Sequence, residues 1–272
     1  MNFDFGQTPQ SDAFFALYPK FLPAFDLLIK LSNQCFGRAS KAKNALEDIC
    51  FGLGHTCRED FLEVTFLCIN DHGGGALKIL RGLYERAVTL EHIIKNPDKI
   101  ERFIKYAAVQ EHKALNAMLK TGISEQEWDK DFSRENTAAK IRDNYNRVKS
   151  EFQMTTCKEC KTQRLSHTWD TDIAAMVDKI GYPYDKLYLA AYSLPTSRIH
   201  ATLSSANIGS ENDRIRWKRQ DSDLALSTAF LLMTYVIAAQ NKLFSLQLDQ
   251  AEIDICERSV LEVWPRPLSD QP

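Results

Sequence analysis

The sequence has almost no alternating runs of β-branched and polar residues bounded by turn residues, and this argues against a sheet-based fold. It also lacks a stretch of about eighteen uninterrupted apolar residues, the length needed to span a membrane. Its first residues, MNFDFGQTPQSD, contain no basic segment followed by an apolar run, as a secretion signal would. We therefore expect a cytoplasmic protein that does not associate with membranes.

Several catalytic and nucleotide-binding motifs are also missing. HGGGALKI, residues 72–79, has neither the spacing nor the final Ser or Thr of a GxxxxGKS phosphate loop. There is no GxSxG elbow, HExxH helix or paired aspartate motif. The sequence therefore does not support P-loop nucleotide binding, serine hydrolysis or metal-dependent phosphoryl transfer.

The charge is nearly balanced, with 34 basic and 36 acidic residues and a formal net charge of -2. RNA binding would therefore depend on a local basic patch and not on the overall charge. The seven cysteines are an odd number spread over 272 residues, which favours reduced thiols over a disulfide framework.

Apolar residues recur at helical spacing through most of the chain, which predicts an all-α fold. We expect a single domain over residues 1–272, a helical bundle of about nine or ten helices, with a long loop near 152–168 and a basic loop near 210–220. The expected helices lie near residues 11–33, 40–53, 59–95, 99–120, 124–151, 170–180, 184–193, 196–206, 221–248 and 251–263.

Capping residues and glycines set the expected boundaries. Ser11 and Asp98 are expected N-caps, and Gly122 is suited to a C-terminal left-handed position. Gly52, Gly54 and His55 are expected to interrupt the chain. The three glycines at 73–75 mark either a kink or a close approach of another helix backbone, and we favour close approach.

The segment ILRGLYERAVTLEH, residues 79–92, carries the first group of candidate site residues. At about 100° per residue, Arg81, Glu85 and His92 share one edge of the helix, and Arg81 and Glu85 have ion-pair spacing. The guanidinium so held could bind a phosphate or a carboxylate. The alternative is a solvated edge with a minor surface salt bridge.

A second group lies in YDKLYLAAYSLPTSRIH, residues 184–200. Tyr184, Tyr188 and Tyr192 repeat at i,i+4 and are predicted to share one face. Ser193 and His200 follow around a proline turn, and a histidine there could act as general acid or base. A single histidine of this kind could equally be a hydrogen-bonded structural residue.

Taken in order, these residues resemble a bacterial all-helical family of unknown function. The resemblance rests on Arg81-x-Leu83-x-Glu85, Trp169, Tyr188-x-x-x-Tyr192-Ser193 and His200, over about residues 60–205. Such proteins are similar in turn to the HEPN superfamily of helical bundles, which includes metal-independent ribonucleases of toxin and phage-defence systems that use an arginine and a histidine. The resemblance implies that these residues converge in one pocket.

The HEPN arginine and histidine are usually separated by four to six residues, which Arg86 and His92 also satisfy. In a straight helix these two side chains point about 120° apart, so they could meet at one phosphate only across a dimer interface or at a kink. We therefore favour the set of Arg81, Glu85 and His200 over this pair.

Two further segments suggest binding. DRIRWKRQ, residues 213–220, is a candidate single-stranded RNA surface, and its alternative is a solvated basic loop. Its candidate contact residues are Arg214, Arg216, Trp217, Lys218 and Arg219.

Cys157, Cys160 and His167 have the spacing of half a zinc site. A fourth ligand is not evident, so we expect no cofactor, with structural zinc as the weaker alternative.

These observations favour a HEPN-like ribonuclease of toxin or phage-defence type that binds RNA and forms a homodimer. The alternative is a noncatalytic binding module, whose polar set is structural or receives a small anionic ligand or a protein partner.

Overall fold

The computed structural model describes residues 5–6, 8–38, 40–132, 136–155, 163–200 and 210–264, without the side chains of residues 132, 163 and 211–217. Helices make up most of this part of the chain, and its one sheet has two short strands. The predicted all-α class is therefore confirmed.

The chain divides into two compact units. Residues 1–95 and 173–272 form the first, here called the core unit, and residues 96–172 form the inserted unit. Neither junction has the Gly-, Ser- or Pro-rich composition of a linker, so composition does not reveal this division. The single domain stays a prediction.

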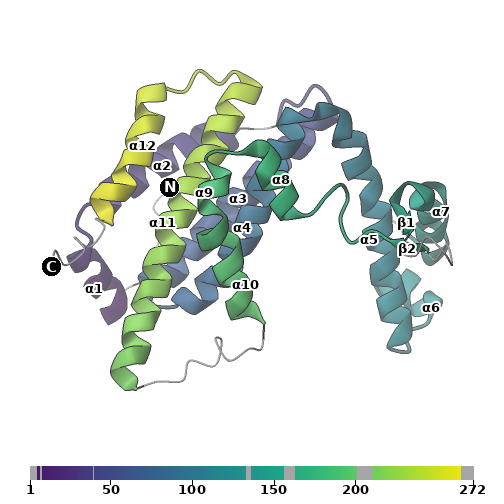
Figure 1. The fold of residues 1–272 in the computed structure, drawn as a ribbon, viewed down its shortest axis with the longest axis horizontal. Helices are drawn as coiled ribbons and strands as arrows, with labels where there is room; N and C mark the ends of the chain where they lie inside the picture. Colours follow the sequence, from purple (N-terminus) through teal and green to yellow (C-terminus); the bar gives the residue numbers. More distant parts are fainter. Residues whose placement is uncertain are drawn as a thin grey trace. The chain divides into compact units, whose positions relative to one another are not determined.

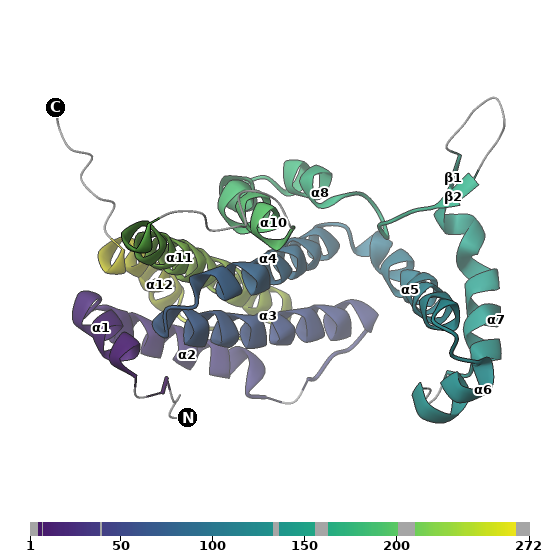
Figure 2. The ribbon, with the colours of Figure 1, turned by 90° about the horizontal axis from the view of Figure 1, so that it is seen from below.

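The core unit is built around three long helices, α3, α4 and α11, which pack against one another. Figure 2 shows α3 and α4 side by side, with α10 over α4. The elements of the core unit are α1 (Pro9–Leu17), α2 (Phe21–Phe36), α3 (Ala45–Ile69), α4 (Gly73–Lys95), α8 (Ile173–Ile180), α9 (Tyr184–Tyr188), the π-helical η4 (Leu189–Ser193), α10 (Leu194–Ile199), α11 (Glu211–Phe244) and α12 (Gln250–Val263).

The predicted central helix is confirmed as α11. Its side chains Leu226, Phe230, Met233 and Ile237 are completely buried. The stretch Lys218–Phe244 is long and apolar enough to cross a membrane by length and composition, and 61% of its most apolar window is buried inside the structure. Packing against α3, α4 and α12 accounts for that composition.

The inserted unit packs α5 against α7 around a small core of Leu115, Ala138 and Ile141. Its elements are η1 (Pro97–Lys99), α5 (Ile100–Lys120), α6 (Glu125–Glu127), the π-helical η2 (Trp128–Phe132), α7 (Ala138–Val148), η3 (Lys149–Phe152), β1 (Gln153–Thr155) and β2 (Gln163–Leu165).

The predicted first helix is wrong in its extent, because residues 9–36 form two helices. Thr8, and not Ser11, is the N-cap of α1, with the Ser11 side chain at the third position completing a capping box. Pro19 separates α1 from α2, since a proline disfavours helix in the residue before it.

The predicted interruption at Gly52, Gly54 and His55 is also wrong, because α3 runs through it. A Cβ at Gly54 would lie 2.6 Å from the Gln240 amide nitrogen and 2.9 Å from the Phe36 ring. This glycine therefore allows close packing inside a helix and does not end one.

The expected long helix over 59–95 is two helices, with a turn at residues 70–72. Gly73 opens α4 where α11 passes close by. A Cβ there would lie 2.4 Å from the Ser222 nitrogen and 2.7 Å from the Lys218 carbonyl oxygen. The predicted close approach of another backbone is confirmed at Gly73, whereas Gly74 has nothing near it.

Predictions for the inserted unit were partly right. Gly122, with a φ of 92°, ends α5 as expected. Asp98 is not the N-cap, because the one-turn helix η1 precedes α5. The helix expected over 124–151 is broken into short pieces, and the expected loop over 152–168 contains the paired strands β1 and β2.

The basic segment near 210–220 is helical and not a loop, because it forms the first turns of α11.

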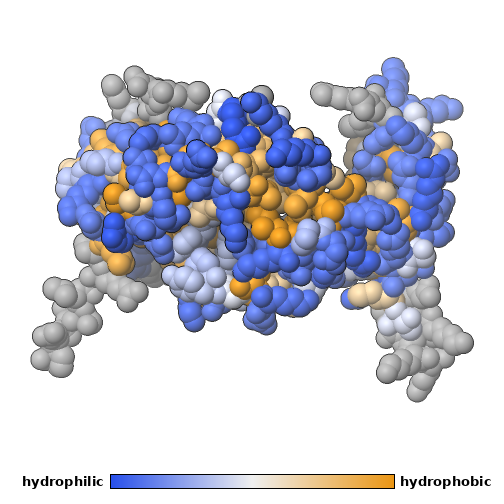
Figure 3. All heavy atoms as spheres, turned by 90° about the horizontal axis from the view of Figure 1, so that it is seen from above, coloured by the Kyte–Doolittle hydropathy of each residue, from blue (hydrophilic) through white to orange (hydrophobic). Residues whose placement is uncertain are grey.

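Apolar side chains are not confined to the interior: Leu189 and Leu261 are well exposed. Figure 3 shows hydrophobic atoms framed by hydrophilic ones on the face seen from above.

A partly buried ion pair joins α3 to α4. Arg86 Nη1 lies 2.5 Å from Asp60 Oδ2, and the Asp60 side chain is 12% exposed. Burial raises the pKa of Asp60 to about 6, although the Arg86 guanidinium opposes this shift.

We predict that Gly73→Ala destabilises the protein by about 1–3 kcal/mol, because the new methyl group would push against the α11 backbone. Gly74→Ala is the matched control. It should be neutral or stabilising by up to about 1 kcal/mol, since alanine favours helix and the site is open. Urea denaturation of both variants measures this, and equal stabilities would contradict the close contact.

We predict that Asp60 makes the free energy of unfolding depend on pH. Its folded pKa lies above the ordinary value of 3.8, so the protonated form stabilises the fold. This contribution is complete below about pH 4 and is lost as the pH rises through 6, by up to about 3 kcal/mol.

Asp60→Asn should therefore flatten the pH profile of stability between these limits. Asp26→Asn, at an exposed position of α2, is the control and should keep the wild-type slope. Denaturant titrations across this range test the point, and parallel profiles for Asp60→Asn and the wild type would contradict it.

Candidate functional site

One edge of α4 carries the candidate site. Leu80, Leu83, Tyr84 and Ala87 of this helix are completely buried. Arg81 and Glu85 lie beside this apolar stripe, with 26% and 38% of their side chains exposed. Helical periodicity therefore places a charged pair at the border between core and surface.

The Arg81 guanidinium is held from two sides. Its Nε donates to Glu85 Oε1 at 2.9 Å, as the i,i+4 spacing predicted. Its Cζ lies 4.9 Å from the centre of the Tyr192 ring, in a cation–π contact. Glu85 and Tyr192 thus orient a cation that solvent can still reach.

Tyr84 is the centre of an aromatic cluster that joins α4 to the segment over residues 184–192. Its hydroxyl donates to the Tyr184 carbonyl oxygen at 2.8 Å. Its ring lies 6.4 Å from that of Tyr188 and 6.2 Å from that of Tyr192. The two motif regions, 100 residues apart, therefore meet in space.

The three tyrosines of this segment do not share one face as predicted. Tyr188 and Tyr192 do lie together, with ring centres 5.2 Å apart, and Tyr184 is the one that points elsewhere. Tyr184 points into the core toward Tyr235, where burial raises its pKa well above the ordinary value. Its hydroxyl has no hydrogen-bond partner among the described residues.

Ser193 and His200 lie at opposite ends of α10, and both are exposed. His200 is the C-cap residue, and its backbone nitrogen donates to the Thr196 carbonyl oxygen at 3.3 Å. Within the described ranges, no hydrogen bond or ion pair links either side chain to Arg81. The structure thus joins Arg81, Glu85 and Tyr192, and His200 is accessible just after α10, the helix that packs against α4.

Arg86 and His92 have separate surroundings. Arg86 is paired with Asp60, and Gly82 leaves room for this pair because a Cβ there would lie 2.8 Å from Arg86 Nη1. His92 is only 1% exposed, so a substrate in solution cannot reach it in this conformation. The structure therefore does not bring these two together at one accessible phosphate site.

The basic segment is described only in part. Lys218 and Arg219 are exposed on α11, whereas the side chains of Arg214, Arg216 and Trp217 lie outside the described residues. The RNA surface stays a prediction.

The half zinc site also stays a prediction. Cys157 and Cys160 lie outside the described residues, and His167 is exposed. No group of three or more metal-ligating side chains occurs in the part of the chain that the structure describes. The five cysteines in that part are free and buried.

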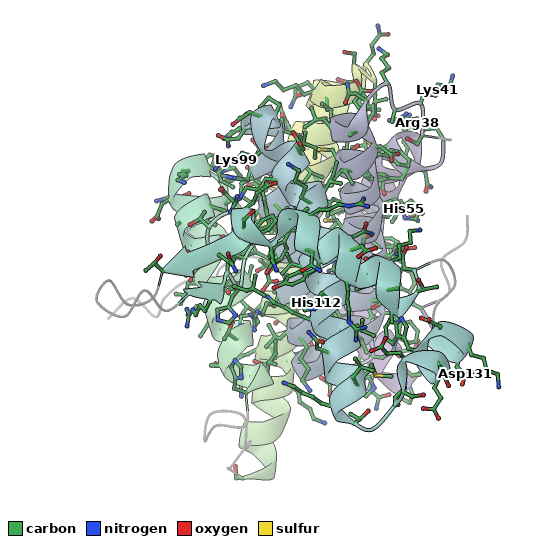
Figure 4. All side chains as sticks on the ribbon, turned by 90° about the vertical axis from the view of Figure 1, so that its right-hand side faces the viewer. Arg38, Lys41, His55, Lys99, His112 and Asp131 are labelled. Atoms are coloured by element: carbon green, nitrogen blue, oxygen red, sulfur yellow. The ribbon has the colours of Figure 1, made fainter. Side chains whose placement is uncertain are left out.

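Two contacts between a basic side chain and aromatic rings were not predicted from the sequence. In the core unit, Arg38 lies over the rings of Phe51 and Phe244, at 5.2 and 4.6 Å from their centres, and Figure 4 shows it near Lys41. In the inserted unit, the His112 ring stacks on Tyr145 with centres 3.7 Å apart.

Burial lowers the pKa of His112, and Arg142 and Lys149 add to this effect. Neither group could be found from spacing alone, because each joins different helices. Asp60 and Tyr84 were missed for the same reason.

Comparison with known protein families matches residues 47–215 to a family of unknown function (DUF5677). No curated protein and no solved structure matches the chain. The matched range contains Arg81, Glu85, Tyr192, Ser193 and His200, and the expectation of a family of unknown function is confirmed. Because the match covers more than half of the chain, the protein belongs to the DUF5677 family.

Proposed function

We propose that the protein is a HEPN-like, metal-independent ribonuclease, with Arg81 as its phosphate-binding residue and His200 as its proton-transfer residue. The proposal rests on the way the Arg81 guanidinium is held and on its Nη hydrogens, which are unpaired among the described residues. Glu85 accepts the Nε hydrogen, and the Tyr192 ring supports the guanidinium. The Nη hydrogens form no hydrogen bond with any described residue, so they are available for the two oxygens of a phosphate.

The proposed reaction is internal transfer at phosphorus. The 2′-oxygen of the RNA forms a bond to phosphorus while the bond to the 5′-oxygen breaks. The neutral His200 imidazole accepts the 2′-hydroxyl proton, and the leaving 5′-oxygen gains a proton from the resulting imidazolium or from water. Arg81 stabilises the charge that develops on the phosphate oxygens. The products are a 2′,3′-cyclic phosphate and a 5′-hydroxyl.

The other site residues have supporting roles in this proposal. Glu85 and Tyr192 orient Arg81, and Ser193 is an exposed hydroxyl at the start of α10. RNA would extend toward the basic start of α11, where Lys218 and Arg219 are exposed. A toxin or phage-defence setting belongs to the same proposal through the family resemblance, and a cytoplasmic homodimer is also part of it.

A noncatalytic binding module is the second candidate. It is favoured by the contacts that Arg81 and Tyr84 already make, which join α4 to the segment over residues 184–192. In this reading the polar set stabilises helix packing, and the exposed guanidinium receives a small anion or a protein carboxylate.

We predict that the wild-type protein cleaves a mixed pool of tRNA and single-stranded RNA in EDTA and leaves 2′,3′-cyclic phosphate ends. His200→Ala should reduce the rate by about a hundredfold or more, because a general base is lost, and Arg81→Ala should do the same through the phosphate. Gel assays with thermal melts measure both effects.

The control is His55→Ala, which removes a half-exposed histidine on α3 (Figure 4) and should leave cleavage unchanged. If the wild type does not cleave RNA, or if folded His200→Ala cleaves at the wild-type rate, the ribonuclease proposal is wrong.

We predict that Tyr84→Phe lowers the free energy of unfolding by about 1–2 kcal/mol, because the Tyr184 carbonyl oxygen loses a buried donor. Tyr192→Phe keeps the ring beneath Arg81 and should cost less than about 0.5 kcal/mol. Urea denaturation compares them. Equal losses would show that the Tyr84 hydroxyl is not a structural link between these segments.

A further inference from the structure

A cavity of about 610 Å³ lies in the core unit. Its lining includes none of the candidate catalytic residues and shares only Arg219 with the candidate RNA surface. It is bounded by α1, by the end of α3 with the turn that follows, and by the part of α11 around residues 219–223. This volume falls within the range of small-molecule sites in proteins.

A partly buried carboxylate lines the cavity. The Tyr18 hydroxyl donates to Asp223 Oδ1 at 2.6 Å. Burial raises the pKa of Asp223, and the Tyr18 hydrogen bond and the Arg219 charge only partly oppose it. A cation placed against Asp223 would compensate for the water that this carboxylate has lost.

The charges lining the cavity favour a cation as well. Asp71 and Asp223 contribute two carboxylates, against the single guanidinium of Arg219. Arg219 is exposed and lies one turn before Asp223 on α11. The lining therefore has an excess of negative charge, although the whole chain is almost neutral.

The remaining wall is suited to an apolar body with a polar end. Phe14 and Ile69 are buried side chains of the lining. Ser222 also lines the cavity, is 5% exposed, and its hydroxyl makes no hydrogen bond of normal geometry with the described residues. A buried hydroxyl in this state can still donate to or accept from a bound molecule.

We propose that this cavity binds a small organic cation, whose primary ammonium group pairs with Asp223 while its apolar body lies against Phe14 and Ile69. The proposal does not depend on ribonuclease activity. The cavity ligand would carry a positive charge, whereas the proposed ligand of Arg81 is a negatively charged phosphate.

Three probes with one aromatic scaffold test the sign of the charge: phenethylamine, phenethyl alcohol and phenylacetate. Isothermal titration calorimetry of the full chain at neutral pH should give saturable binding of the amine, at least about tenfold tighter than the alcohol. Phenylacetate should bind most weakly. Tightest binding of phenylacetate, or no saturable binding of the amine, would overturn the proposal.

Variants locate the site. Asp223→Asn should remove the preference for the amine over the alcohol, while its amide oxygen can still accept from Tyr18. Arg219→Gln should strengthen amine binding a few-fold, because a competing cation is removed, and this gain cannot result from a damaged fold. Asp26→Asn, on the exposed side of α2, should change neither value. Unchanged amine binding in both cavity variants would place the ligand elsewhere.

Discussion

The burial of α4 is the constraint on which the rest of the core unit depends. This helix is packed by α3 and α11 and also by α8, η4 and α10, so a large part of its circumference is removed from water. Polar side chains on such a helix must be paired or placed at the border of the buried stripe. Arg86 is paired with Asp60. Arg81 and Glu85 lie at the border of the buried stripe and are also paired with each other.

The two ion pairs differ in whether their guanidinium is presented to a ligand. The Asp60–Arg86 pair joins two long helices and is the less exposed at its carboxylate, so its effect is on stability and its dependence on pH. The Arg81–Glu85 pair lies within one helix, where such a pair contributes only a few tenths of a kcal/mol. Its value is orientation, because it presents a guanidinium against an aromatic ring at a surface that a phosphate could reach.

Close packing explains why several glycines lie inside helices. Gly73 admits the α11 backbone, Gly54 admits the Gln240 amide and the Phe36 ring, and Gly82 admits the Arg86 guanidinium. Each of these glycines lowers the local helix propensity. Gly73 and Gly54 gain contacts with other helices, whereas Gly82 makes room for a side chain one turn later in its own helix. The same approach of α11 to α4 brings Ser222 and Asp223 to the wall of the cavity near α1.

The sequence predicts the helical class, the central position of α11, the pairing of Arg81 with Glu85, the C-terminal end of α5 and the extent of α12. These follow from periodicity, i,i+4 spacing and capping, which act within a few residues. It did not determine the division into two units, the continuity of α3, the helical state of residues 211–220 or the burial of His92. The contacts of Asp60 with Arg86 and of Tyr84 with Tyr184 were decided by the tertiary structure, because residues 26 and 100 positions apart meet only when whole helices pack.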